Sequence, residues 1–305
     1  MDTIERNLLL QVADMDGVPE GAYNIRSNGK LAGRQSTANI EITSKEDKPG
    51  IDIHIKPGTK HESMHIPVVM TESGMNDLVY NDFYVGEDAD VLIIAGCGIN
   101  NCGHQTSQHD GIHTFWVGKN ARVKYVEKHY GEGEGDGARV LNPETVIHLS
   151  ENSYMEMVSV QIKGVDSTVR NTVGDLADGA TLIISEKIMT HENQVAETNF
   201  TVDMNGVDCH ADVVSRSVAR GNSKQIFNSS INGNKRCTGH SECDAIIMDS
   251  AHVVARPALE ANDLDASLIH EAAIGKIAGE QIIKLETLGL TEQEAEEQII
   301  SGFLK

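Results

Sequence analysis

Short segments of alternating apolar and polar residues follow one another along most of the chain. Residues 39–43 and 51–55 show the pattern clearly, with isoleucine at every second position. Such alternation is typical of β-strands that bury one face. Further strands are predicted at 65–70, 78–85, 91–95, 114–117 and 123–129, and residues 144–270 continue the pattern with almost no helical periodicity. The chain is therefore predicted to be mainly β.

Turn-then-strand units recur at a nearly constant interval in the second half of the chain. The second residues of three such units, Ser153, Ala180 and Val207, are spaced by 27 residues. A constant interval of this size predicts stacked β coils, a β-solenoid. In such a stack, equivalent positions of adjacent coils lie about 4.7–4.9 Å apart. Residues 27 apart are therefore expected to be spatial neighbours.

The N-terminal residues carry a different pattern. Residues 2–13 place apolar side chains on one face of a short helix, which Gly17 and Pro19 end. Residues 22–34 are predicted to form a β-hairpin around Asn28-Gly29, because Asn-Gly is a strongly favoured hairpin turn. We expect this helix and hairpin to form an N-terminal region at 1–60.

Helical periodicity returns only after residue 271. Good helix formers fill residues 278–287, and Thr291 begins a second helix through a Thr-Glu-Gln-Glu capping box. The apolar side chains of this region either pack on the protein's own β core or are offered to another subunit. The candidates for contact with a partner are Ile282, Leu285, Ile299 and Phe303. The expected organisation is thus a β core at 61–271 followed by a C-terminal helical region at 272–305.

The 305-residue chain is strongly acidic, with a formal net charge of −21. Such a surface repels the phosphates of nucleic acids and anionic membranes, so neither is an expected partner. The longest apolar run, 91–95, is far shorter than the roughly 20 residues that span a bilayer. The first residues lack the basic and apolar segments of a signal peptide, so a cytoplasmic location is expected. Five cysteines, an odd number, suit free thiols in a reducing compartment better than disulfides.

Residues able to bind a soft or borderline metal are concentrated near the end of the predicted β region. Cys237, His240 and Cys243 follow one another at intervals of three, and His270 and Glu271 come one predicted coil later. Thiolate and imidazole hold such metals and iron–sulfur clusters. Because His270 lies 27 residues after Cys243, the two are expected on adjacent coils, close enough to share a ligand. The alternative is that Cys243 is a small buried hydrophobe at the start of a strand.

The geometry of a straight strand limits which of these residues can share one metal ion. Positions three apart point to opposite faces, so Cys237, His240 and Cys243 converge only if the chain turns at Thr238-Gly239. Glycine permits such a turn. The adjacent histidine and glutamate likewise need a strand end or a bulge to serve one site. Cys237 and His240 are therefore additional ligand candidates beside Cys243.

A second set of potential ligands lies in a glycine-rich stretch. Cys97, Cys102, His109 and His113 occur within 17 positions. One interpretation is a mononuclear metal site, and the other is a polar loop with incidental thiols. The acidic glycine repeat at 131–137 lacks the lysine and hydroxyl residue of a phosphate-binding loop, and no other nucleotide motif is present. Any energy input is therefore expected to come from a partner.

The C-terminal part resembles a known family. The elements that carry the resemblance are Glu-Cys-Asp-Ala-Ile-Ile at 242–247, Pro-Ala-Leu-Glu at 257–260, His-Glu-Ala-Ala-Ile-Gly-Lys-Ile at 270–277 and Gly-Phe at 302–303. In this order they resemble the SufB/SufD family, scaffold subunits of the Suf machinery for iron–sulfur cluster assembly. The resemblance implies a right-handed parallel β-helix with short helical parts at both ends. It also implies a SufC-type ABC ATPase bound to the C-terminal helices and a cluster built between two scaffold subunits.

Residue by residue, the resemblance implies specific roles. Cys243 matches the SufB cysteine that accepts sulfur and binds the cluster, and Glu271 matches the SufB glutamate of the same site. His270 matches the histidine that SufD contributes across the subunit interface. One chain with all three implies a homodimer in place of the heterodimer, although a second SufB/SufD-like scaffold remains an alternative. The scaffold itself is expected to be no enzyme, and its cluster is expected to be transient, so the purified protein can lack it.

Two further interpretations stay open at this point. One is a non-catalytic SufD-like subunit that only organises its partner. The other is a metalloprotein that uses the set from Cys97 to His113. The chain is shorter than typical SufB, and its N-terminal region does not resemble the usual long helical extension, so the sulfur donor is not indicated.

Overall fold

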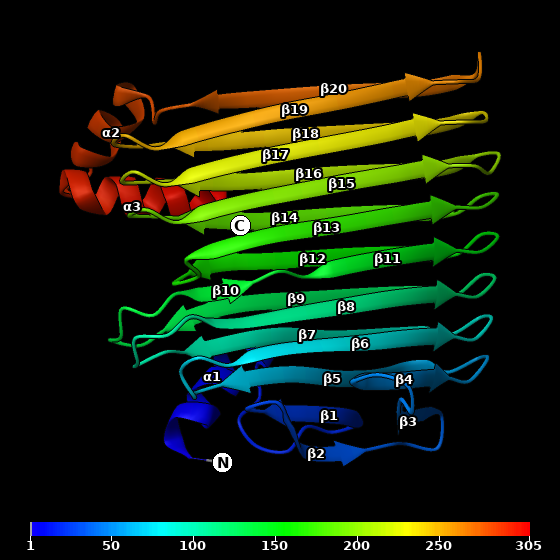
Figure 1. Ribbon diagram of the computed structural model, residues 1–305. Helices are drawn as coiled ribbons and strands as arrows, with labels where there is room; N and C mark the ends of the chain where they lie inside the picture. The colour runs from blue at the N-terminus through cyan, green and yellow to red at the C-terminus, as the bar shows by residue number, and fades with distance from the viewer. Residues whose placement is uncertain (1) are drawn as a thin grey trace.

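The structure, a computed structural model, describes residues 2–305. Successive strands alternate between two long parallel walls that stack coil upon coil, so the chain is a β-solenoid of about eight turns (Figure 1). One helix lies at the N-terminal end and two at the C-terminal end. The expected β-solenoid core with short helical parts at both ends is confirmed.

The first wall, called wall A, has the strand order β2-β1-β5-β7-β9-β12-β14-β16-β18-β20. Its strands are β1 (Ala22–Ser27), β2 (Lys30–Gln35), β5 (Lys60–Met70), β7 (Asp90–Asn100), β9 (Arg122–Glu132), β12 (Tyr154–Lys163), β14 (Thr181–Thr190), β16 (Cys209–Ala219), β18 (Cys237–Ile247) and β20 (Ala266–Gly275). All neighbours pair in parallel except β1 and β2, which form the predicted hairpin. Asn28 and Gly29 both have positive φ at its turn, as the Asn-Gly sequence predicts.

The second wall, called wall B, has the order β19-β17-β15-β13-β10-β8-β6-β4-β3, and β11 also pairs with β13 and β8. Its strands are β3 (Ile40–Ser44), β4 (Gly50–Ile55), β6 (Asn76–Val85), β8 (Ser107–Val117), β10 (Arg139–Leu141), β11 (Glu144–Leu149), β13 (Ser167–Leu176), β15 (Val195–Met204), β17 (Lys224–Gly233) and β19 (His252–Ala261). Every second side chain of both walls points into the lumen between them, where most form one continuous apolar core.

The coils are less uniform than the sequence suggests. Tyr154 pairs with Thr181, an interval of 27, but Thr181 pairs with His210, an interval of 29. In the earlier coils Asn76 pairs with Gln108, an interval of 32. The constant interval of 27 is therefore correct for one pair of coils and wrong for the next, because turns of different length join the strands.

The N-terminal helix α1 (Thr3–Ala13) covers part of the outer face of wall A. A capping box between Asp2 and Glu5 begins it, and Leu8 and Val12 are fully buried in a small cluster with Val69. The backbones approach closely here because β7 carries glycine at the contact. A Cβ at Gly96 would lie 2.4 Å from the Val12 carbonyl oxygen.

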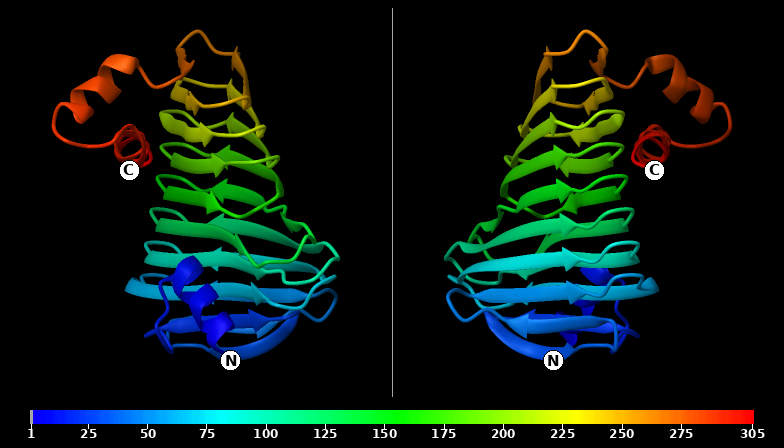
Figure 2. Two further views of the ribbon diagram at one scale, coloured as in Figure 1. Left: turned by 90° about the vertical axis from the view of Figure 1, so that its left-hand side faces the viewer. Right: turned by 90° about the vertical axis from the view of Figure 1, so that its right-hand side faces the viewer.

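The C-terminal helices α2 (Gly279–Glu286) and α3 (Glu292–Phe303) stand beside wall A (Figure 2). Ile300 and Leu304 of the last segment pack on Val218 of β16, whereas α2 buries no residue. The end of the solenoid is left open, since β19 pairs only with β17 and β20 only with β18. None of the helices within residues 2–305 is long and apolar enough to cross a membrane.

Candidate functional site

Cys243 points into the lumen one coil before the open end. Its side chain is 1% exposed and sits in register between Ser215 of β16 and Ala272 of β20. It lines a small internal cavity together with Glu186 and Phe227. Burial, assisted by the charge of Glu186, raises the pKa of the Cys243 thiol to about 12. The thiol is therefore protonated and shielded in this conformation.

His270 lies on the neighbouring strand, on the same lumenal side. It pairs in register with Ser241, two residues before the position opposite Cys243. Strand geometry then separates the Cα atoms of Cys243 and His270 by about 8 Å. Both ring nitrogens of His270 are buried and have no hydrogen-bond partner within residues 2–305. Burial lowers the pKa of this imidazole, so it is neutral and one ring nitrogen carries a free lone pair.

Glu271 points the other way, to the outer face of wall A. It pairs in register with Glu242, and these two carboxylates form a group with His240, here called the outer triad. One ligand atom from each of the three residues lies within 4.8 Å of the others. The His240 Nδ1 atom is 2.8 Å from Asp212 Oδ1, which leaves Nε2 to bind a metal ion. A carboxylate behind a histidine is the arrangement that commonly orients a metal ligand.

The outer triad carries an excess of negative charge. Asp244 lies beside Glu242, and burial together with this neighbour raises the pKa of the Glu242 carboxyl. The cation nearest to Glu242 is Arg216, whose Nη2 atom is 3.6 Å from Oε1. Glu242 is not among the metal ligands predicted from the sequence. The signal for it is the His-x-Glu spacing on one strand, which places both side chains on one face.

The structure does not bring Cys237, His240 and Cys243 together. Strand β18 runs straight through Gly239, so the two thiols face the lumen and the imidazole faces outward. A Cβ at Gly239 would lie 2.7 Å from Leu268 Cδ2, so this glycine serves close packing and makes no turn. Cys237 instead lies in register with the buried Cys209, a neighbour that the sequence analysis did not anticipate.

Three of the four residues in the second predicted metal site lie around one cavity. Cys97 of wall A and the two histidines of wall B, His109 and His113, are buried and line one internal cavity, here called the lumenal cavity. Cys102 lies outside it, exposed in the loop after β7, with its thiol 3.1 Å from Asn100 Oδ1. The buried His129 and Glu127 complete the polar lining of the cavity.

The sequence carries the signature of one protein family across this whole region. The family described as SUF system FeS cluster assembly, SufBD core domain, matches residues 71–303. The chain belongs to the SufBD family. The match includes both open-end strands, the outer triad, and Cys97, His109 and His113 of the lumenal cavity.

Three archaeal relatives are each named iron–sulfur cluster assembly SufBD family protein. The Archaeoglobus fulgidus protein is 27% identical over 278 residues, which cover 90% of this chain and 73% of the relative. The Methanocaldococcus jannaschii protein is 26% identical over 93% of this chain and 90% of its own length. The Pyrococcus horikoshii protein is 24% identical over 98% of this chain and 94% of its own length. The chain is therefore similar to these SufBD proteins nearly end to end.

In this SufBD chain the C-terminal helices divide their apolar residues between the core and solvent. Ile282, Leu285 and Ile299 are half-buried, and Phe303 packs against the cluster around Val218. The most exposed apolar side chains of the region are two that the sequence analysis did not select. Ile283 of α2 is 60% exposed, and Leu288 just after it is 72% exposed.

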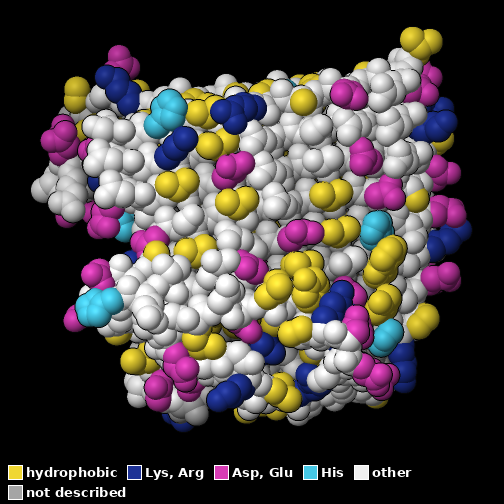
Figure 3. All heavy atoms as spheres, viewed as in Figure 1, with side chains coloured by type: hydrophobic (Ala, Val, Ile, Leu, Met, Phe, Trp, Pro, Cys, Tyr) yellow, Lys and Arg dark blue, Asp and Glu magenta, His cyan; other side chains and the backbone are white. Residues whose placement is uncertain are grey.

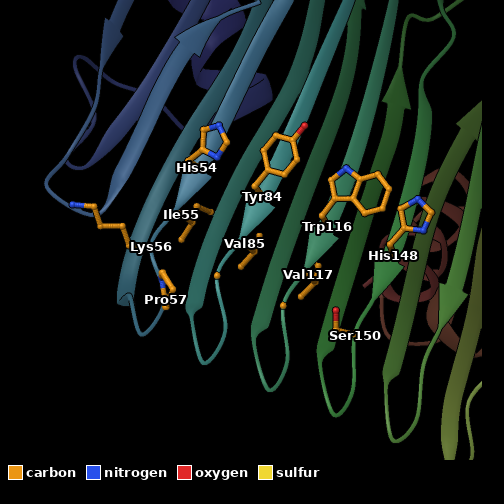
Figure 4. A pocket seen from close by; sticks show the side chains of 12 residues that line it. His54, Ile55, Lys56, Pro57, Tyr84, Val85, Trp116, Val117, His148 and Ser150 are labelled. Atoms are coloured by element: carbon orange, nitrogen blue, oxygen red, sulfur yellow. The ribbon is translucent and has the colours of Figure 1, made fainter.

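A second open surface of this SufBD chain lies far from Cys243, on wall B. Apolar side chains gather on part of this wall among acidic ones (Figure 3). Outward-facing rings follow one another in register there and line a hollow of about 510 Å³ (Figure 4). They stack in two pairs, His54 on Tyr84 and Trp116 on His148. These four rings are here called the aromatic ladder. Its signal in the sequence is the regular spacing of aromatic and imidazole rings by 30 to 32 residues.

Proposed function

We propose that this chain is a scaffold on which iron–sulfur clusters are assembled, with Cys243 as the sulfur acceptor. One observation carries the proposal. At the open end of a SufBD solenoid, Cys243 shares the lumen with His270, whose two ring nitrogens have no hydrogen-bond partner in the described part of the chain. His270 is half-buried, but shielded ring nitrogens without a hydrogen bond are unfavourable unless a ligand or a partner subunit completes them. Thiolate and imidazole are suitable ligands for an iron–sulfur cluster.

Sulfur transfer at Cys243 follows ordinary persulfide chemistry. The Cys243 thiolate attacks the outer sulfur of a donor persulfide, so a new S–S bond forms at Cys243 and the donor leaves as a thiolate. The thiolate is needed because a thiol is a poor nucleophile, yet burial keeps Cys243 protonated. Opening of the last coil to water would restore its ordinary pKa. The proposed function therefore requires a conformational change at the open end.

The outer triad supplies the place where iron is taken up in this proposal. A histidine with two carboxylates suits a borderline divalent ion such as Fe²⁺. Glu271 belongs to this outer group, while Cys243 and His270 face the lumen. One cluster can touch all of them only if β20 moves away from β18. The proposed source of that motion is a SufC-type ATPase bound to the C-terminal helices. Its proposed contacts are Ile282, Ile283, Leu285, Ile299 and Phe303.

A homodimer fits the open end. Strands β19 and β20 each leave one backbone edge unpaired, and Leu259 and Ile269 on them are exposed. Unpaired edges with apolar side chains pair readily with a second copy of the same strands. Such pairing would bring two copies of Cys243 and His270 to one interface.

Anaerobic reconstitution with Fe²⁺ and sulfide tests the proposal. A Cys243→Ser protein is expected to lose most of the cluster absorbance that the unmodified chain develops. Cys102→Ser is the matched control, because Cys102 is exposed and remote from the lumen, and it should reconstitute normally. Equal absorbance in the Cys243→Ser protein would rule out the assignment.

A non-catalytic, SufD-like scaffold is the second candidate function. The deep burial of Cys243 favours it, because a thiol that never opens to solvent cannot accept sulfur. Capture of the ATPase by the chain with no uptake of iron or sulfur would favour this candidate over the first.

A further inference from the structure

The lumen is polar in the middle coils, where an apolar core would be simpler. Asp77 and Asn81 of β6, with the two histidines of β8, occupy inward positions of adjacent coils and pair with one another in register. All four side chains are at least 93% buried. Burying groups of this kind is costly unless they are paired, so a concentration of them around a cavity points to a binding site.

Hydrogen bonds fix how His109 presents itself. Its Nδ1 atom is 3.2 Å from Asp77 Oδ2, and Arg26 holds the other carboxylate oxygen at 2.7 Å. The carboxylate accepts, so Nδ1 carries the proton and Nε2 keeps its lone pair. This is the same support that carboxylates give to metal-bound histidines.

His113 is held in the same tautomer from the opposite side. Its Nδ1 atom is 2.7 Å from the Tyr125 hydroxyl, which donates its own proton to Glu127 at 3.0 Å. The hydroxyl oxygen therefore accepts from Nδ1–H, and Nε2 again keeps the lone pair. Asn81 Nδ2 lies 3.2 Å from that nitrogen and donates to it, so this hydrogen bond has to break before Nε2 can bind an ion.

Gly111 opens the space between the two imidazoles. It lies midway between His109 and His113 on β8 and faces the lumen as they do. A Cβ at this position would be 3.3 Å from the Nε2 atom of each ring. Both lone pairs therefore border one small space that any side chain here would fill, and Cys97 lines the same cavity.

We propose that Cys97, His109 and His113 bind one divalent ion of the zinc or ferrous class inside the lumen. A thiolate with two imidazoles is a ligand set that such borderline ions prefer. Binding replaces the thiol S–H bond with a sulfur–metal bond and releases one proton. The three ligand atoms do not all lie within 4.8 Å of one another, so binding requires the two rings to turn toward each other over Gly111. This site is separate from the proposed assembly site and does not depend on it.

Cobalt is a suitable probe because Co²⁺ bound to thiolate has a sulfur-to-metal charge-transfer band. The full-length chain, freed of metal and incubated with Co²⁺, is expected to take up one ion with this band. Cys97→Ser should abolish the band, and His109→Ala and His113→Ala should each weaken binding at least tenfold. Gly111→Ala leaves every ligand in place but obstructs the space, so it should also weaken binding. Cys102→Ser and Cys243→Ser are the matched controls and should bind as the unmodified chain does.

The outcomes separate this site from the assembly site. Loss of the band in Cys243→Ser with retention in Cys97→Ser would place the ion at the open end and overturn the proposal. Unchanged affinity in both Gly111→Ala and His109→Ala would overturn it as well. Circular dichroism of each variant shows whether it is folded, and the mild Gly111→Ala change keeps the test decisive if a histidine variant does not fold.

Discussion

Cys243 and Glu271 lie on adjacent strands of wall A but on opposite faces of it. The thiol points into the lumen from β18, and the carboxylate points outward from β20, level with Glu242. The alternation of side chains along a strand enforces this separation, since Glu271 neighbours the inward-facing His270. In the proposed function, the sulfur acceptor lies on one side of the wall and the iron ligands on the other, as two half-sites. If that proposal is correct, sulfur and iron stay apart until the end of the solenoid rearranges.

The burial of Cys243 predicts how the thiols react with alkylating reagents. In the native chain at pH 7.5, iodoacetamide is expected to modify Cys102 quickly and Cys243 at least a hundredfold more slowly, because only Cys102 is exposed. Peptide mapping by mass spectrometry measures both rates. The other buried thiols should also be protected, namely Cys97, Cys209 and Cys237.

The same experiment tests the proposed opening. Addition of the SufC-type ATPase with ATP should raise the alkylation rate of Cys243 and leave that of Cys209 unchanged. Rapid modification of Cys243 in the isolated chain would show that the lumen is already open and would contradict the protection expected from its 1% exposure.

The sequence predicts the arrangement within a strand better than the arrangement between strands. The alternation of residues predicts the faces of a straight strand, and it correctly separates His240 from Cys243. It does not predict the register between neighbouring coils. His270 was expected opposite Cys243 from the 27-residue interval, but Ala272 occupies that position. Turn lengths set the register, and no local pattern fixes them within two residues.

The outer triad and the aromatic ladder illustrate the same limit. His240 and Glu242 lie two apart on one strand, so the sequence could have paired them. Their meeting with Glu271 depends on the register between β18 and β20. The stack of Trp116 on His148 likewise needs an interval of 32 residues, which differs from the interval of the later coils. Long-range neighbours in a solenoid become predictable only when each coil's own length is known.

Arg170 is predicted to be the most sensitive charge in the lumen. It is 1% exposed, forms an ion pair with Glu127, donates to His129 Nδ1 at 3.1 Å and lies 3.6 Å from Glu186 Oε1. Arg170→Met removes the one cation, among residues 2–305, that lies within 4 Å of both buried carboxylates. Breaking a buried pair from one side typically costs about 3–5 kcal/mol, and urea unfolding should show a loss of this size.

Lys119→Met is the control for this change. Lys119 pairs with Glu151 at 2.8 Å, but both side chains are about half exposed, so the variant should unfold like the unmodified chain. Addition of Glu127→Gln to Arg170→Met should recover part of the loss, because one unpaired charge is then removed. Equal stability of Arg170→Met and Lys119→Met would show that the buried carboxylates find other partners.

Acid is predicted to destabilise the contact between α1 and wall A. His65 lies between Tyr23 and Ile94 in the region that α1 covers, and its Nδ1 atom is buried without a partner. Burial lowers its pKa below 6.5, partly opposed by the charge of Asp14. The unfolded chain therefore binds a proton that the folded chain resists. The free energy of unfolding therefore has its full value above pH 6.5 and decreases as the pH drops toward the lowered pKa of His65.

Urea unfolding at pH 7.5, 6 and 5 in the presence of EDTA measures this dependence. His65→Leu cannot be protonated and should flatten the pH dependence of the free energy of unfolding. His252→Leu, at an exposed position of β19, should leave the slope unchanged. An unchanged slope in His65→Leu would assign the acid sensitivity to the lumenal histidines instead.

The two C-terminal helices are predicted to divide the work between docking and stability. The helix α2 buries no residue, and Ile283 together with Leu288 leaves an apolar surface in water. Ile283→Asp and Leu288→Asp should therefore abolish co-purification with the SufC-type ATPase while leaving the melting temperature unchanged. Ile300→Ala in α3 should do the reverse, because Ile300 packs on Val218, and an isoleucine-to-alanine change in a core costs about 2–5 kcal/mol. Normal capture of the ATPase by the Ile283→Asp, Leu288→Asp double variant would mean that the partner binds elsewhere and that α2 is exposed for another reason.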